Sequence, residues 1–244
     1  LGDVHSSTKA RMKIANIHRI RGRLDQASNL YKDGILIFER LGDMRARAIT
    51  IGKLADVLQQ RGQLDEALRL RQQEQLPVFE RLGDVRSRAI TLGKIAEILL
   101  VRGQPQEALR ICQEDVLPAL EQLGDSRSTA FSMGQIADIL RSQGRFREAL
   151  RIRQEEELPV YERLGDIRSK AIALGQIADI LQAQGQLNEA LRLLQEDVLP
   201  PLEKLGAKRE IAISQQKIME IAAALRSPPL ATPGAQSVTD PTHT

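Results

Sequence analysis

Apolar and polar residues alternate along this chain with the period of an α-helix. In the first half of residues 41–81, the apolar positions recur three and four residues apart, as they do on one face of a helix. These positions are Ala48, Ile51, Ala55 and Leu58. A second apolar run begins at Leu64, directly after the turn signal Gly62-Gln63. The pattern therefore predicts two helices joined by a short turn, that is, a helical hairpin.

The tripeptide Leu-Gly-Asp separates one hairpin from the next. It occurs at Leu1, Leu41, Leu82, Leu123 and Leu164, and Leu-Gly-Ala follows at Leu205. The spacing is 40 residues once and then 41 residues four times. We expect Gly42 to end one helix and Asp43 to cap the N-terminus of the next. A fixed period of this length is typical of stacked repeat proteins, because a single hairpin cannot bury its apolar face alone.

The period predicts an all-α fold, a right-handed α-solenoid of five helical hairpins plus a C-terminal capping helix. We expect the solenoid to occupy residues 1–226. Residues 227–244 are rich in Pro, Ser and Thr, so we expect a disordered tail or linker there. The predicted units are 1–40, 41–81, 82–122, 123–163 and 164–204, with the capping helix at about 207–226. Residues 1–40 diverge most from the other units and are interpreted as an N-terminal cap.

A proline recurs late in the second helix of every unit except the first. Proline inside a helix costs about 3 kcal/mol, so four copies in one register indicate a structural role. The first unit lacks this proline and is also one residue shorter. We therefore expect a kink, a bulge or a short break that accommodates both the extra residue and the proline. The prolines are Pro77, Pro118, Pro159 and Pro200.

The start of each second helix resembles that of the tetratricopeptide repeat. The residues that carry the resemblance are Gly-Gln-Leu-Asp-Glu-Ala-Leu at Gly62, with a small residue at Ala67, Ala108, Ala149 and Ala190. The longer period and the Leu-Gly-Asp junction resemble the 40–42-residue variant of LGN-type polarity proteins, kinesin light chains and bacterial signalling ATPases. The resemblance extends over residues 1 to about 226. It implies a concave groove, formed by the first helices, that receives a peptide or protein segment.

Glycines, apolar residues and carboxylates recur on the face of the first helices that should line this groove. The glycines are Gly52, Gly93, Gly134 and Gly175, and the apolar row is Ile49, Ile90, Phe131 and Ile172, with Ile213 in the last helix. The polar candidates are Lys13, Asn16, Lys53, Asp56, Lys94, Glu97, Asp138, Asp179 and Glu220. We expect these residues to contact a partner. The alternatives are that the glycines only allow close helix packing, and that the acids pair with neighbouring lysines.

An arginine also recurs two residues after the junction aspartate, or its replacement, in every unit except the first. Guanidinium groups suit phosphate, but we favour pairing with the cap aspartates or with glutamates of the neighbouring helix. These arginines are Arg45, Arg86, Arg127, Arg168 and Arg209. The single cysteine, Cys112, takes a position that is arginine in two other units, and we expect it to fill a packing slot. No catalytic motif, metal-ligand cluster or cofactor motif is recognisable, so we expect no enzyme, no metal and no cofactor.

Charge and hydropathy make some classes of function less favoured than others. The net charge is +3, and residues 1–40 alone carry +4. A nucleic-acid-binding solenoid should be basic along its whole length, so this class is the least favoured. No apolar run is long enough to span a bilayer, and one cysteine suits a reducing compartment, so we expect a cytoplasmic protein without a membrane partner. Because the chain lacks an initial Met and begins in phase with the repeat, we expect a piece of a longer protein.

The sequence therefore predicts a non-enzymatic scaffold that binds a peptide or protein segment in a concave groove. One alternative is a sensor or regulatory arm of a larger, bacterial signalling protein. Another is a homo-oligomer formed by end-to-end stacking, since similar units could continue the array across two copies.

Overall fold

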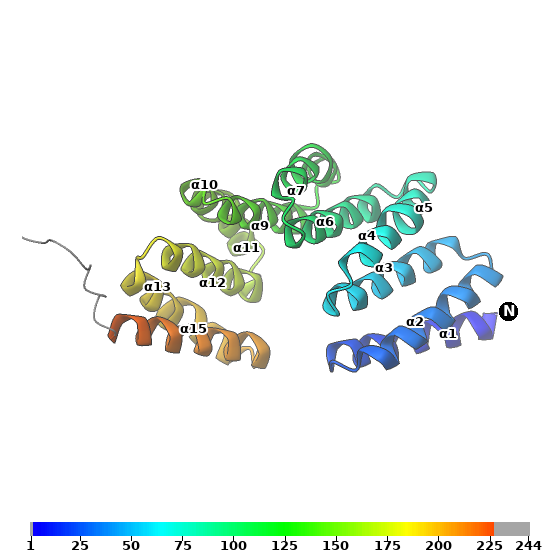
Figure 1. Ribbon diagram of the computed structural model, residues 1–244, viewed down its shortest axis with the longest axis horizontal. Helices are drawn as coiled ribbons and strands as arrows, with labels where there is room; N and C mark the ends of the chain where they lie inside the picture. Colours follow the sequence, from blue (N-terminus) through cyan, green and yellow to red (C-terminus); the bar gives the residue numbers. More distant parts are fainter. Residues whose placement is uncertain (1, 227–244) are drawn as a thin grey trace, which may run out of the picture. The chain divides into compact units, whose positions relative to one another are not determined.

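The computed structural model describes residues 2–226, and every regular element in that range is helical. The fold is all-α and consists of helical hairpin repeats of the α-solenoid class, as the period predicts (Figure 1). The first helix of each repeat is continuous. These helices are α1 (Gly2–Ile20), α3 (Met44–Gln60), α6 (Val85–Val101), α9 (Ser126–Ser142), α12 (Ile167–Ala183) and α15 (Lys208–Arg226).

The second helix is continuous only in the first repeat, where it is α2 (Leu24–Arg40). In each later repeat, a segment of wider π-helix separates two short α-helices. In chain order these are α4 (Leu64–Arg69), η1 (Leu70–Gln75) and α5 (Leu76–Arg81); α7 (Pro105–Arg110), η2 (Ile111–Val116) and α8 (Leu117–Gln122); α10 (Phe146–Arg151), η3 (Ile152–Glu157) and α11 (Leu158–Arg163); and α13 (Leu187–Leu193), η4 (Leu194–Val198) and α14 (Leu199–Lys204).

The π-segments explain the recurrent prolines. Each proline is the second residue of the α-helix that follows a π-segment, where its missing N–H removes no bond from an uninterrupted α-helical ladder. The first repeat has neither the proline nor a π-segment, and it is the repeat with one residue fewer. The extra residue is therefore accommodated as a π-bulge, which confirms the predicted bulge among the three alternatives.

The Leu-Gly-Asp junctions have the predicted geometry. Gly42 has a φ of 71°, in the left-handed region that closes a helix at little cost only for glycine. The Asp43 carboxylate accepts a hydrogen bond from the Ala46 backbone N–H at 2.8 Å and so caps α3. The equivalent aspartates of the next three first helices accept the same bond from Ser87, Ser128 and Ser169.

The recurrent arginines bind the cap aspartate of the following repeat. Arg45 contacts Asp84 at 2.7 Å, and Arg86 contacts Asp125 at 2.5 Å. Burial raises the pKa of Asp84, but hydrogen bonds from Ser87 and Arg45 outweigh it, so the pKa lies below its ordinary value. Arg127 and Asp166 form a further pair of this kind at 2.8 Å, and in the first repeat His5 replaces the arginine and contacts Asp43 at 2.8 Å. For these arginines, pairing is thus observed in place of a free phosphate-binding column.

Contacts divide the chain into two compact units, Leu1–Ala173 and Leu174–Thr244. Within the first, α2 packs between α1 and α3 and contributes the buried side chains of Tyr31 and Phe38. The small residue near the start of each second helix is fully buried, as the resemblance implies. Assigning residues 1–226 to one solenoid stays a prediction, and the predicted tail, 227–244, lies outside the described residues. In the described part of the chain, no helix is long and apolar enough to cross a membrane.

Candidate functional site

The predicted apolar row is exposed to solvent. In the first compact unit, Ile49 is 37% exposed, Ile90 49%, Phe131 52% and Ile172 40%. A row of large apolar side chains at one helical register, each exposed by a third or more, is a candidate interaction surface. Ile213 continues the register in the second compact unit and is 44% exposed.

Two neighbouring pockets lie on this surface of the first compact unit. The first, of about 280 Å³, is lined by Ile90 of α6 and Phe131 of α9, with Val116, Leu120 and Tyr161 of the second helices. The second, of about 260 Å³, shares Ile90 and Lys94 with the first. It is further lined by the predicted residues Ile49, Gly52, Lys53 and Asp56. The first pocket likewise contains the predicted residues Gly93, Lys94, Glu97 and Phe131.

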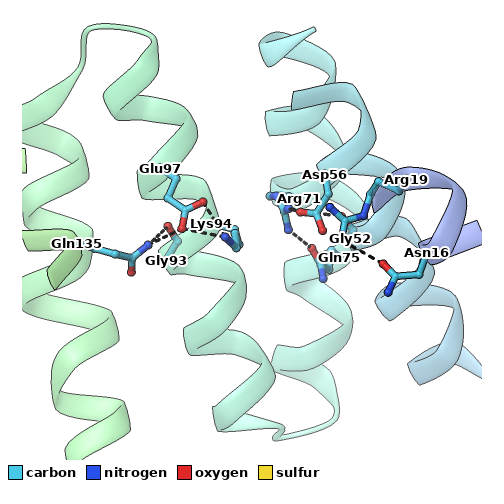
Figure 2. Close-up of polar contacts among 10 residues, drawn as sticks. All are labelled: Asn16, Arg19, Gly52, Asp56, Arg71, Gln75, Gly93, Lys94, Glu97 and Gln135. Carbon is cyan, nitrogen blue, oxygen red and sulfur yellow. Dashed lines mark hydrogen bonds and ion pairs between the residues drawn. The ribbon is translucent and has the colours of Figure 1, made fainter. Parts of the chain in front are cut away.

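The acidic residues of this surface are bonded within the chain. Asp56 binds the guanidinium of Arg71, which is 2% exposed and also donates to the side chain of Gln75 at 3.1 Å (Figure 2). In α9, Asp138 binds the equivalent guanidinium of Arg153 at 2.7 Å. A buried arginine of the second helix thus neutralises the carboxylate of its own repeat, because a buried charge without a partner is strongly unfavourable.

The other acidic residues have a different partner. Glu97 accepts from Lys94 at 2.8 Å and from the Gln135 amide of the next first helix at 2.7 Å (Figure 2). In the second compact unit, Asp179 pairs with Lys217 of the following first helix at 2.6 Å. In these repeats, a residue of the next first helix replaces the buried arginine.

Carboxylates paired with a buried arginine alternate along the chain with carboxylates paired with a residue of the next first helix. The pattern of interior side chains therefore repeats every two hairpins. The position of the buried arginine reads Arg71, Cys112, Arg153 and Leu194 in successive repeats, and the position four residues later reads Gln75, Val116, Glu157 and Val198. Polar pairs therefore alternate with apolar pairs. The sequence analysis recognised the arginines at the position of Cys112 but missed the matching alternation four residues later, which makes the pairs visible.

Cys112 occupies an apolar slot of this alternation. It is fully buried, which confirms the predicted packing role. Burial, with the nearby Glu97 charge, raises the pKa of its thiol to about 12, so no thiolate nucleophile forms near neutral pH. Among residues 2–226, no group of three or more His, Cys, Asp or Glu side chains has the arrangement of a metal site.

The fourth repeat contains one more buried charge than the second. Arg153 lies between two carboxylates, since it binds Glu157 at 2.6 Å as well as Asp138, whereas Arg71 lies between Asp56 and an amide. Burial raises the pKa of Glu157 to about 7, against the opposing effect of the Arg153 charge. The cluster of Asp138, Arg153 and Glu157 therefore changes its net charge close to neutral pH, as Glu157 loses its proton.

The recurrent glycines make room for these interior side chains. A Cβ on Gly52 would lie 2.3 Å from the Gln75 amide nitrogen, and one on Gly134 would lie 2.5 Å from a carboxylate oxygen of Glu157. On Gly93 it would meet Gln135 at 3.1 Å, but on Gly175 it would be 3.9 Å from Val198. The first three glycines thus accommodate polar side chains, whereas the apolar neighbour of the fourth leaves space.

The structure does not gather all the predicted site residues. Those brought together lie on α3, α6 and α9 around the two pockets. On α1, Lys13 is exposed and Asn16 accepts from Arg19 at 3.1 Å (Figure 2). Gly175, Asp179 and Glu220 belong to the second compact unit, where Glu220 accepts from Gln216 at 2.8 Å. Partner contact by any of these residues stays a prediction.

Comparison with known proteins identifies the repeats. Family models described as tetratricopeptide repeat match residues 53–73, 87–163 and 171–198, which together make up more than half of the chain. No curated protein matches the sequence significantly.

Solved structures with the same fold have low sequence identity to the chain. One is a Podosopora anserina protein described as a kinesin light chain with nearly identical TPR-like repeats (19% identity, 91% of this chain and 97% of that one, TM-score 0.59). Another is a Rap protein complexed with competence and sporulation factor (15% identity, 88% of this chain and 74% of that one, TM-score 0.64). A third is a signal transduction ATPase with a tetratricopeptide repeat sensor from Pyrococcus horikoshii (15% identity, 91% of this chain and 34% of that one, TM-score 0.65). At these identities the likeness concerns the fold alone. The family is shown by the three family matches: the chain belongs to the tetratricopeptide repeat superfamily.

Proposed function

We propose that the protein is a non-enzymatic scaffold that binds a peptide or protein segment along the first helices of its first compact unit. The observation that carries the proposal is the exposed apolar row with the pocket between α6 and α9. Phe131 and Ile90 keep large apolar side chains in water beside a pocket of about 280 Å³, which has room for one or two apolar side chains. Binding would remove this apolar surface from water.

Recognition should depend on apolar contacts more than on the acidic residues. Glu97 and Asp138 are already bonded to Lys94, Gln135 and Arg153, so a basic ligand would have to compete with those partners. We therefore assign the anchor of the partner to a large apolar side chain in the pocket. The paired polar groups at its edge would orient the backbone of the bound segment.

The test is site-specific photocrosslinking in the full chain. A photoreactive amino acid is placed at Phe131 and, as a control, at Leu36, which is exposed on α2 away from the pockets. Crosslinks from position 131 alone should map to one partner segment that contains a large apolar residue. A synthetic peptide of that segment should then bind the chain, and Phe131→Asp should weaken binding at least tenfold without changing the circular dichroism spectrum. Equal crosslinking from both positions, or unchanged binding by the variant, would contradict the proposal.

A further inference from the structure

The two pockets of the first compact unit are the same site in successive repeats. We call them the α3–α6 pocket, of about 260 Å³, and the α6–α9 pocket, of about 280 Å³, after the first helices that line them. Every residue that lines the α3–α6 pocket, except Arg71, has an equivalent one repeat later that lines the α6–α9 pocket. The differences between the two pockets therefore show how each repeat changes a shared site.

The second helices line the two pockets with different chemistry. Arg71 and Gln75 line the α3–α6 pocket. In the α6–α9 pocket, Val116 takes the position of Gln75, and Leu120 lies one turn further along. The alternation of interior pairs thus reaches the surface, and it makes the α6–α9 pocket the one that suits an apolar side chain.

The same alternation decides which lysine of the pockets is paired. Lys94 binds Glu97, three residues later, at 2.8 Å (Figure 2). The equivalent of Glu97 in α3 is Asp56, which already binds Arg71 of the second helix. Lys53 therefore lacks the partner that its spacing would give it, and no other carboxylate in the described part of the chain forms an ion pair with it.

Lys53 is a cation that the protein leaves without a compensating charge. The other cations that line the two pockets, Arg71, Lys94 and Arg127, each bind a carboxylate. Lys53 is partly buried, and burial together with the nearby Arg19 charge lowers its pKa, against the opposing effect of Asp56. A negative group placed beside Lys53 would therefore be favourable.

We propose that the α3–α6 pocket binds a side-chain carboxylate of the same segment whose large apolar residue enters the α6–α9 pocket. The carboxylate belongs to an aspartate or glutamate and contacts Lys53. The proposal rests on the proposed function, since it adds a second contact to that segment. The two contacts are neighbours, because both pockets are lined by Ile90 and Lys94.

The geometry also sets the separation of the two ligand residues. Packed helices lie roughly 10 Å apart, and an extended chain rises about 3.3 Å per residue. The acidic residue should therefore lie about three residues from the apolar anchor. A basic ligand residue fits the α3–α6 pocket less well, because three cations line it and its carboxylate, Asp56, is bound to Arg71.

The test begins with a random peptide library displayed on phage as an internal fusion, selected on the full chain. The wild type should select a large apolar residue with an aspartate or glutamate about three residues away. Lys53→Gln should still select the apolar residue but lose the preference for the acidic one. Lys32→Gln is the matched control, since Lys32 is exposed on α2 and lines neither pocket, and it should select as the wild type does.

Affinities of one selected peptide then test the contact directly. The peptide is synthesised with an amidated C-terminus, so that only a side-chain carboxylate can reach Lys53, and is titrated by fluorescence anisotropy. Changing its acidic residue to the corresponding amide should weaken binding to the wild type at least fivefold. The same change should alter binding to Lys53→Gln less than twofold, as expected for a contact that this variant has already lost. Circular dichroism verifies that each variant is folded.

The two proposals fail in different ways. Selection without any apolar preference would contradict the groove itself. An apolar preference without an acidic one, an acidic preference that Lys53→Gln retains, or binding that requires a free C-terminal carboxylate overturns the assignment of Lys53 and leaves the apolar pocket in place.

Discussion

Replacing Glu157 by glutamine should remove a pH-dependent loss of stability from the fourth repeat. Glu157 is 4% exposed, and its carboxylate shares Arg153 with Asp138. The equivalent Gln75 gives the second repeat the same geometry without the second negative charge. Glu157→Gln therefore introduces a side chain that the protein already uses at this position. The introduced amide oxygen can accept from Arg153 as Gln75 accepts from Arg71.

The magnitude follows from the shift in pKa. The pKa of Glu157 rises from an ordinary 4.5 to about 7 in the folded protein. Between these values the unfolded chain has released a proton that the folded chain retains, so stability falls as pH rises through this window. The contribution of Glu157 to stability is fully retained below pH 4.5 and is lost above about pH 7. At 1.36 kcal/mol per unit, the wild type should lose about 2 to 3 kcal/mol between roughly pH 5 and pH 8 through this group.

The assay is urea unfolding followed by circular dichroism at both pH values. The stability of Glu157→Gln relative to the wild type should increase by about 2 kcal/mol from the lower to the higher pH. Glu155→Gln, at a side chain that is 66% exposed, is the matched control and should show no such change. Gln75→Glu should introduce the same pH dependence into the second repeat. A difference between Glu157→Gln and the wild type that is independent of pH would refute the reasoning.

Two further predictions concern the interior. Gly175→Ala should stabilise the protein by up to about 1 kcal/mol, because alanine favours a helix and its Cβ meets Val198 only at 3.9 Å. Gly134→Ala should instead destabilise the protein, because the Cβ would lie 2.5 Å from a Glu157 carboxylate oxygen that is held by Arg153. Thermal melts of the two glycine variants measure this contrast, and equal melting temperatures would contradict it. Cys112 should not react with a thiol reagent in the folded protein near neutral pH and should react at once in urea, because it is fully buried and its pKa is about 12; rapid modification of the native protein would show that the site opens.

The alternation of interior pairs is present in the sequence, but the sequence alone does not show that these residues are buried and paired. Arg71 and Arg153 are charged residues in an amphipathic helix, and sequence reasoning places such residues on the surface. Only the fold shows that each guanidinium is buried and bonded to a carboxylate of the paired first helix, about fifteen residues earlier in the chain. The acidic row therefore has partners inside the protein that helical spacing within one helix could not identify.

The sequence by itself determined the local structure, because that information is local. Helical periodicity, the positive-φ glycine and the capping aspartate of each Leu-Gly-Asp junction act within a few residues, and the one-residue difference of the first unit marks where the π-bulge is absent. The tertiary structure decided which side chains meet. It shows that Gly52 and Gly134 make room for interior side chains and that Ile90 and Phe131 flank a pocket. It also shows that Lys94 is paired with a carboxylate and Lys53 is not, because pairing depends on which side chain the opposite helix presents and not only on the residue's own neighbours in the chain.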